Sequence, residues 1–202
     1  MTTDESRTQI HRFVRELERL AERKTEDRAA LARLKRCAGR PLAESLEALP
    51  LLYELGRSGI PEHAEEQFFL VATLFPFAPS RLRAEEAAEG RQDFGGTLRW
   101  LATRPKVNAD GVDRRVTVLL DADRDELPFR LRQAVRMLAQ HDPAVDWRLL
   151  LRHLLAWESP SRWVQKRWAR SYFGLAPEPS TEEIVNAPVE ETLLNEETSN
   201  VG

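Results

Sequence analysis

The stretch from Arg114 to Phe173, RRVTVLLDADRDELPFRLRQAVRMLAQHDPAVDWRLLLRHLLAWESPSRWVQKRWARSYF, decides the fold of this chain. Apolar residues recur in it every three or four positions, which is the spacing of one face of an α-helix. The pattern occurs three times, at Leu127, Leu131, Ala134, Val135 and Leu138, then at Trp147, Leu150, Leu151, Leu154 and Leu155, then at Val164, Trp168 and Tyr172. Basic residues lie outside each stripe, so each predicted helix has one apolar face and one basic face.

Local signals mark where these helices begin. Asp146 is placed to cap the second helix, and Ser159-Pro160-Ser161 is a strong start signal for the third. The segment Val116–Leu120 is rich enough in β-branched residues to favour a strand by propensity alone. A lone strand would have no partner elsewhere in the chain, so we expect a short helix there.

The same spacing, broken by glycine and proline, predicts further helices over 8–24, 25–38, 42–56, 62–75 and 97–103. The fourth of these is apolar almost all round and should form a buried centre. Residues 79–96 are polar and glycine-bearing, which is typical of a mobile loop.

We therefore predict an all-α protein of two small helical bundles, over 1–103 and 113–174, joined by a turn-rich linker over 104–112. A disordered acidic tail is expected over 175–202, since residues 177–202 contain seven glutamates and no lysine or arginine. Without those residues the chain has 30 basic and 26 acidic side chains, so the net charge changes from −3 to +4.

Composition excludes several classes of protein. The chain is 42% apolar and 31% charged, as soluble globular proteins are, and no stretch approaches the length of a membrane span. The polar N-terminus lacks the apolar centre of a signal peptide, so we expect a cytoplasmic location. The lone Cys37 rules out a multi-cysteine zinc site.

No local motif indicates catalysis, a cofactor or a metal, so we predict a protein that is not an enzyme. Nucleotide-binding glycine motifs and histidine pairs with metal-ligand spacing are missing from the sequence. Asp121, Asp123 and Asp125 alternate as calcium ligands do, but Glu126 and Arg132 stand where such a loop needs glycine and glutamate. Helix capping and solvation are the expected roles of these three aspartates.

Most tryptophans are expected in the core, namely Trp100, Trp147, Trp157 and Trp168. Trp163 lies off the main stripe of its helix, so it either packs at the edge of the core or stacks on a base or a second subunit. Phe129 is a further apolar side chain expected at a contact.

Basic side chains at helical spacing bind phosphate backbones rather than read bases, unless they merely solvate a helix face. The candidate nucleic-acid-binding residues are Arg33, Lys35, Arg36, Arg114, Arg115, Arg124, Arg132 and Arg136, with Arg162, Lys166 and Arg170 as a second set. We expect these side chains to merge into one positive surface.

Three ordered pieces of the chain, Leu120–Leu127, Val145–Trp157 and Val164–Phe173, carry a resemblance to a known family. With the upstream string Arg28–Arg36, they resemble the small subunit (CasB family) of Cascade, the type I-E CRISPR surveillance complex. The resemblance covers about two thirds of the chain, and its specificity lies in the order of the pieces.

This resemblance implies a non-catalytic, all-helical subunit that works as a pair within a ribonucleoprotein. Its implied partners are a guide RNA, the target and displaced DNA strands, the backbone and large subunits of Cascade, and a second copy of itself. Arg36, Arg124 and Arg136 rank first as contacts, Arg36 and Arg124 because they fall inside the family-like pieces and Arg136 because it lies between two of them. Arg124 has an alternative in pairing with Asp121 or Asp125.

Two other functions remain open from the residues alone. A free-standing DNA-binding regulator would need a helix rich in base-reading amides, whereas these faces carry mainly arginine and lysine. A protein–protein adaptor with an incidental basic surface is the other alternative.

Overall fold

The computed structural model describes residues 3–22, 28–57, 59–79 and 92–175, and all regular structure within these ranges is helical. The α-helices are α1 (Thr3–Glu22), α2 (Arg28–Cys37), α3 (Leu49–Leu55), α4 (Glu65–Leu74), α5 (Phe94–Ala102), α6 (Ala109–Asp121), α7 (Leu127–Leu138), α8 (Trp147–Leu155) and α9 (Trp163–Phe173). The predicted all-α class is therefore confirmed. The predicted tail, apart from Leu175, and most of the predicted loop over 79–96 lie outside the described residues.

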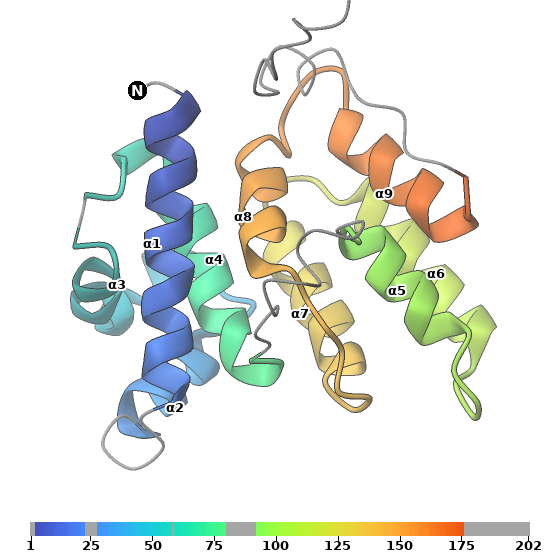
Figure 1. The fold of residues 1–202 in the computed structure, drawn as a ribbon, viewed down its shortest axis with the longest axis horizontal. Coiled ribbons are helices and arrows are strands. Elements are labelled where there is room, and N and C mark those ends of the chain that lie inside the picture. Colours follow the sequence, from blue (N-terminus) through green and yellow to red (C-terminus); the bar gives the residue numbers. More distant parts are fainter. Residues whose placement is uncertain (1–2, 23–27, 58, 80–91, 176–202) are drawn as a thin grey trace, which may run out of the picture.

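The helices form two groups that meet along α4, α7 and α8 (Figure 1). On one side, α1 to α4 pack together, while on the other side α5 pairs with α9 and α6. Contacts of α4 with α7 and α8, and of α1 with α8, join the groups, and their buried apolar residues form one continuous core. The helical stripes predicted for α7, α8 and α9 all face this core, with only Leu155 partly exposed.

The packing of α5 bears on where the chain divides. This helix belongs to the predicted N-terminal bundle by sequence range, yet its main contacts are with α9 and α6. In addition, α6 begins at Ala109, inside the range predicted as a linker, because the side chain of Asn108 caps it by accepting from the Gly111 amide at 3.1 Å. The division over 104–112 stays a prediction, and it would separate α5 from the helices that it mainly contacts.

Several helix boundaries differ from the predicted ones. Residues 42–48 form two 3₁₀ turns before α3, and a third such turn precedes α4. The helix expected at 97 begins at Phe94, because Asp93 accepts a hydrogen bond from the Gly96 amide at 2.9 Å. The start of α9 is two residues past the Ser-Pro-Ser signal, after Arg162 with a positive φ of 50°. The segment predicted as a short helix over 116–120 is part of α6.

Gly95 lies in the first turn of α5, where the helix contacts α9. A Cβ atom at this position would lie 2.1 Å from the carbonyl oxygen of Trp168, far inside any permitted contact. The backbones of α5 and α9 therefore approach each other more closely than any other residue would permit. Gly95 therefore marks tight helix packing, and the prediction of a loop reaching residue 96 was wrong.

Buried tryptophans link distant segments of the core, because an indole N–H group that is shielded from water needs a hydrogen-bond acceptor. Trp147 donates to the carbonyl of Ala78 at 3.0 Å, and Trp157 donates to the carbonyl of Ala122 at 3.2 Å. Both bonds join segments far apart in sequence. Trp147, Trp157 and Trp168 are buried, as predicted, but Trp100 is only partly buried.

Candidate nucleic-acid interface

The first group of predicted contacts lies on α2. Arg33, Lys35 and Arg36 are all exposed, while Leu34 and Cys37 on the other side of the helix are buried. The Lys35 ammonium lies 4.7 Å from the centre of the Phe77 ring, which holds its position without neutralising its charge. Neither Arg33 nor Arg36 has an ion pair within the part of the chain that the structure describes.

Gly39, two residues past the end of α2, packs against α7. A Cβ atom at Gly39 would lie 2.6 Å from Cδ of Arg132, so the stem of that arginine packs directly on the glycine. Arg132 is therefore half-buried rather than turned fully to solvent, and its Nε is buried without a hydrogen-bond partner. Arg136, one helical turn further on, is exposed and has no ion pair among the described residues.

We call Arg33, Lys35, Arg36, Arg132 and Arg136 the α2–α7 surface. It crosses the junction between the two helix groups, since α2 belongs to one and α7 lies against the other. Because the terminal nitrogens of these side chains are not matched by nearby carboxylates, the surface keeps its positive charge.

A second group lies on α6 and α9, which pack against each other. Arg114 and Lys166 are exposed, and Arg170 is half-buried. Arg115 is also exposed, but its Nη1 donates to the Gly111 carbonyl at 2.8 Å. Arg162 donates to the Leu120 carbonyl at 2.7 Å and lies 3.7 Å from the Asp121 carboxylate. Because α6 also packs on α7, the two groups occupy adjoining helices, and one continuous positive surface stays a prediction.

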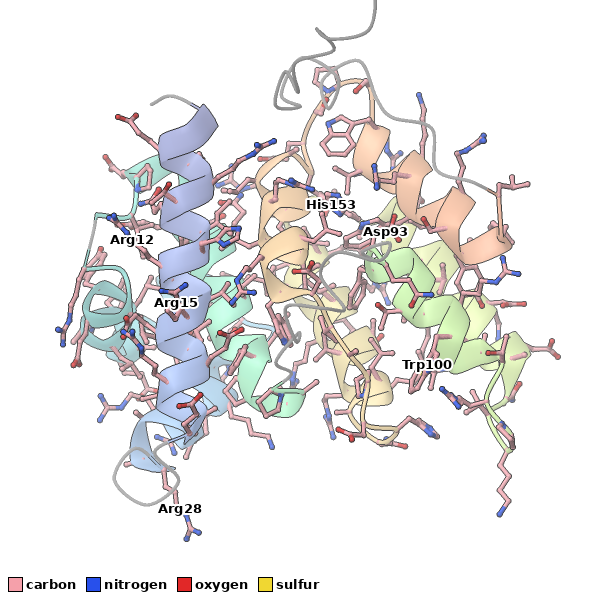
Figure 2. All side chains as sticks on the ribbon, in the orientation of Figure 1. Arg12, Arg15, Arg28, Asp93, Trp100 and His153 are labelled. Atoms are coloured by element: carbon pink, nitrogen blue, oxygen red, sulfur yellow. The ribbon has the colours of Figure 1, made fainter. Side chains whose placement is uncertain are left out.

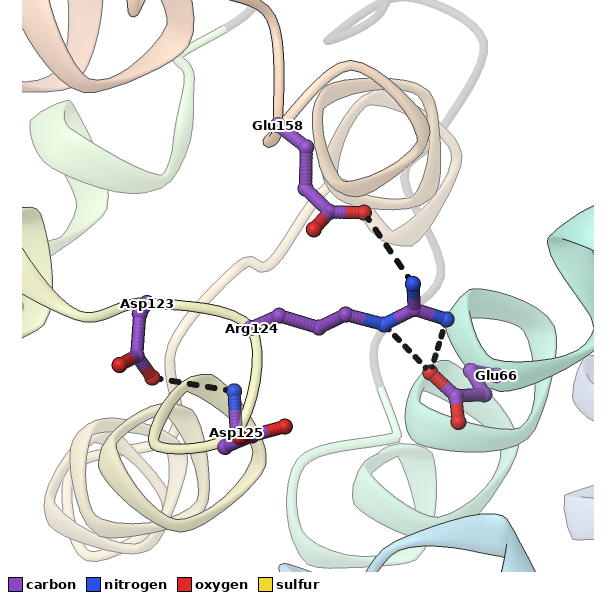
Figure 3. Close-up of polar contacts among 5 residues, drawn as sticks. All are labelled: Glu66, Asp123, Arg124, Asp125 and Glu158. Carbon is purple, nitrogen blue, oxygen red and sulfur yellow. Dashed lines mark hydrogen bonds and ion pairs between the residues drawn. The ribbon is translucent and has the colours of Figure 1, made fainter.

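Arg124 has a different environment, which Figure 3 shows. Its Nη2 and Nε donate to the same Glu66 oxygen at 2.8 and 3.1 Å, and Nη1 lies 3.7 Å from Glu158. The bond to Glu66 and the charge of Glu158 raise the pKa of Arg124. The carboxylates that neutralise Arg124 come from α4 and from the segment after α8. The sequence had suggested Asp121 or Asp125 as its partner instead.

The sequence missed two exposed arginines on α1, Arg12 and Arg15, which Figure 2 labels. The alternation of arginine and glutamate on that helix predicts that neighbours pair, but Glu16 and Glu18 pair with arginines other than Arg12 and Arg15. Glu16 pairs with Arg19 at 2.5 Å, and Glu18 pairs with Arg148 of α8 at 3.0 Å. Arg12 and Arg15 can be recognised as exposed charges only once the partners of the α1 glutamates are known, and one of those partners depends on the contact between α1 and α8.

His153 on α8 is fully buried and contacts α9. Its Nδ1 accepts a hydrogen bond from the indole of Trp168 at 2.9 Å, so the neutral ring carries its proton on Nε2. Burial, together with the charges of Arg167 and Arg152, lowers its pKa well below the ordinary 6.5. The ring of Trp163 packs edge-on against this histidine at 5.5 Å, which places Trp163 at the edge of the core.

Of the three alternating aspartates, Asp123 orders the turn that leads into α7. Asp123 accepts from the backbone amides of Asp125 and Glu126, at 3.0 and 2.9 Å, which orders the turn before α7. Among the described residues, no three histidine, cysteine or carboxylate side chains are grouped as metal ligands. No helix in the described ranges is long and apolar enough to cross a membrane.

Comparison with known proteins gives consistent results. The family model described as CRISPR-associated protein Cse2 matches residues 30–173. A Cse2 protein of Thermus thermophilus is 34% identical over 164 residues, which cover 81% of this chain and 89% of that protein.

Solved structures show the same similarity. A crystal structure of a Cse2-family protein from Thermus thermophilus matches with a TM-score of 0.66 and 32% identity, covering 82% of this chain and 97% of that one. A chain of a CRISPR RNA-guided surveillance complex shares the fold, with a TM-score of 0.65, 21% identity, and coverage of 82% and 93%.

Proposed function

This chain belongs to the Cse2 family of CRISPR-associated proteins, and we propose that it is the small, non-catalytic subunit of a type I-E CRISPR surveillance complex in antiviral defence. In that role it binds nucleic-acid backbone through basic helix faces and stabilises the displaced DNA strand, so that the R-loop stays open. Its partners are then the guide RNA, the target and displaced strands, the backbone and large subunits, and a second copy of itself in the cytoplasm.

The observation that carries this proposal is the α2–α7 surface. Arg33 and Arg36 on α2 and Arg136 on α7 are exposed and have no ion pair in the described ranges, and Gly39, just after α2, packs on Arg132 of α7. Arginines arranged in this way bind phosphates by releasing counterions, and such binding is largely independent of base sequence.

A few phosphate contacts are enough to keep the R-loop open, because strand opening is nearly balanced in free energy. The RNA–DNA heteroduplex is about as stable as the DNA duplex that it replaces, so opening is nearly balanced in free energy. Three phosphate contacts on the displaced strand shift such a balance, whereas they would not melt a duplex alone. The surface needs only to hold a strand that base pairing with the guide has already displaced.

The test is reconstitution of the complex with and without this chain. We expect the chain to copurify with guide RNA and the partner subunits. We also expect thymines of the displaced strand to stay reactive toward permanganate, which modifies unpaired thymines, for a longer time when the chain is present. A complex that assembles without the chain and holds the strand open equally long would contradict the proposal. A stable preference of the isolated chain for one duplex sequence would favour the regulator instead.

A further inference from the structure

The turn between α5 and α6 carries a tryptophan and an arginine stacked on each other. Trp100, near the C-terminal end of α5 (Figure 2), is partly buried and packs against the core. The guanidinium carbon of Arg104 lies 4.0 Å from the centre of its ring. This distance places the guanidinium in stacking contact with the indole face.

Backbone hydrogen bonds fix the position of this pair. The Arg104 amide donates to the Leu101 carbonyl at 3.0 Å, and the Val107 amide donates to the Arg104 carbonyl at 3.2 Å. The Thr103 hydroxyl donates to the carbonyl of Trp100 at 2.9 Å. Because α5 is itself held against the backbone of α9 at Gly95, the turn is attached to a rigid support.

The charge of this turn is not neutralised. Residues 103–108 include Arg104 and Lys106 and no acidic side chain. Both cations are exposed, and neither has an ion pair within the described ranges. Arg104 is therefore oriented by an aromatic ring, and its planar group keeps its full charge.

An arginine whose guanidinium lies over an aromatic ring can offer its other face for stacking as well as its charge. Unpaired bases stack on aromatic rings and on guanidinium planes, and the weak hydration of guanidinium favours this. An ion pair with a protein carboxylate is the usual alternative use of such an arginine, and among the described residues no carboxylate is placed to form one here.

We propose that Trp100 and Arg104 form a stacking site for one unpaired nucleotide base, with Lys106 binding the adjacent phosphate. The proposal rests on the proposed function, and it adds recognition of the unpaired state to a surface that otherwise binds backbone alone. The base comes from either the displaced DNA strand or an unpaired segment of RNA, which present the same π-face and flanking phosphate.

The test uses the full chain and three short single-stranded probes, oligo(dT), oligo(rU) and an abasic DNA of equal length. Arg104→Lys keeps the charge but removes the planar group, and it leaves the core intact. Since stacking contributes about 1–3 kcal/mol per base, we expect Arg104→Lys to weaken oligo(dT) binding about fivefold or more and to leave abasic binding unchanged. Arg57→Lys, at an exposed arginine paired with Glu54, is the matched control and should bind all probes normally.

Trp100→Leu should produce the same selective loss and should also remove part of the tryptophan quenching caused by oligo(dT). Tighter binding of oligo(dT) than oligo(rU) identifies the displaced strand as the source of the base, and the reverse order identifies RNA. Equal binding of oligo(dT) by Arg104→Lys and the wild type, or equal losses on oligo(dT) and abasic DNA, would overturn the stacking site.

Failure of the two proposals can be told apart with one more variant. Removing Arg33, Arg36 and Arg136 tests the α2–α7 surface without touching Trp100. If this triple variant binds normally while Arg104→Lys loses oligo(dT) binding selectively, the stacking site stands and the surface does not. No binding of any probe by the wild type would count against both.

Discussion

Substitution of Gly95 by alanine should destabilise the protein, although alanine is the better helix former. The added Cβ would lie 2.1 Å from the Trp168 carbonyl oxygen and 2.7 Å from the adjacent carbon atoms, about 1.3 Å inside the 3.4 Å of ordinary contact. These are backbone atoms, so α9 as a whole must move away from α5. Trp168, which is 1% exposed and packs on Phe94 and Trp157, would move with it.

The expected magnitude is a balance of two effects. Replacing glycine by alanine in a helix gains about 0.5–1 kcal/mol, whereas overpacking a tight core costs about 1–3 kcal/mol or more. The overpacking cost should lie at the upper end here because no flexible side chain can yield. We therefore expect the free energy of unfolding to fall by about 2 kcal/mol.

Urea denaturation of the full chain measures this change, with Gly111→Ala as the control. Gly111 also lies in the first turn of a helix, but a Cβ there would meet only the end of the Arg115 side chain at 3.4 Å and the Asn108 side chain at 3.5 Å. Gly111→Ala should therefore be neutral or stabilising, with both variants keeping the wild-type denaturant slope. A Gly95→Ala variant as stable as the wild type would contradict the close approach of the α5 and α9 backbones.

Two further predictions concern buried and bridging charges. Burial lowers the pKa of His153, so the folded protein keeps this side chain neutral, whereas the unfolded chain binds a proton below pH 6.5. The free energy of unfolding should therefore fall as pH drops below 6.5, by up to about 1.4 kcal/mol per pH unit. Urea titrations at pH 5.5 and 7.5 should show a smaller difference for His153→Gln than for the wild type, and an unchanged difference would refute this. Glu18→Gln should lower the free energy of unfolding by about 1–3 kcal/mol, because it leaves the Arg148 charge, 24% exposed, without its partner. Glu66→Gln should cost less than about 1 kcal/mol, because Arg124 is 54% exposed and water screens that pair, so equal losses would contradict the comparison.

The sequence predicted much of the fold because helical stripes are local patterns. The stripes of α7, α8 and α9 and the cap at Asp146 follow from spacing and side-chain chemistry, and both features occur as expected. The start of α5 was missed because glycine usually marks a loop, and only contact with α9 shows why Gly95 is needed. The partner of α5 is likewise a tertiary property, which no local pattern contains.

The sequence predicted where the charged residues lie on their helices, but it did not predict which of them form ion pairs. Arg124 and Arg136 look alike in sequence, yet one is neutralised by Glu66 and Glu158 and the other is free of ion pairs in the described ranges. The difference arises from α4 and from the segment after α8, which are far from Arg124 in sequence. The same reason hid Arg12 and Arg15, whose neighbouring glutamates pair with other arginines.

The salt dependence of displaced-strand binding tests the central claim most directly. In the reconstituted complex, the chain with Arg33, Arg36 and Arg136 replaced by alanine is compared with a control in which the paired arginines Arg19, Arg57 and Arg124 are replaced. Both variants lose the same net charge, so only the position of the charge differs. If the α2–α7 surface binds three phosphates, the slope of log affinity against log salt should fall by about 2 in the first variant and change little in the control. Equal slopes in the two variants would show that this surface does not hold the strand.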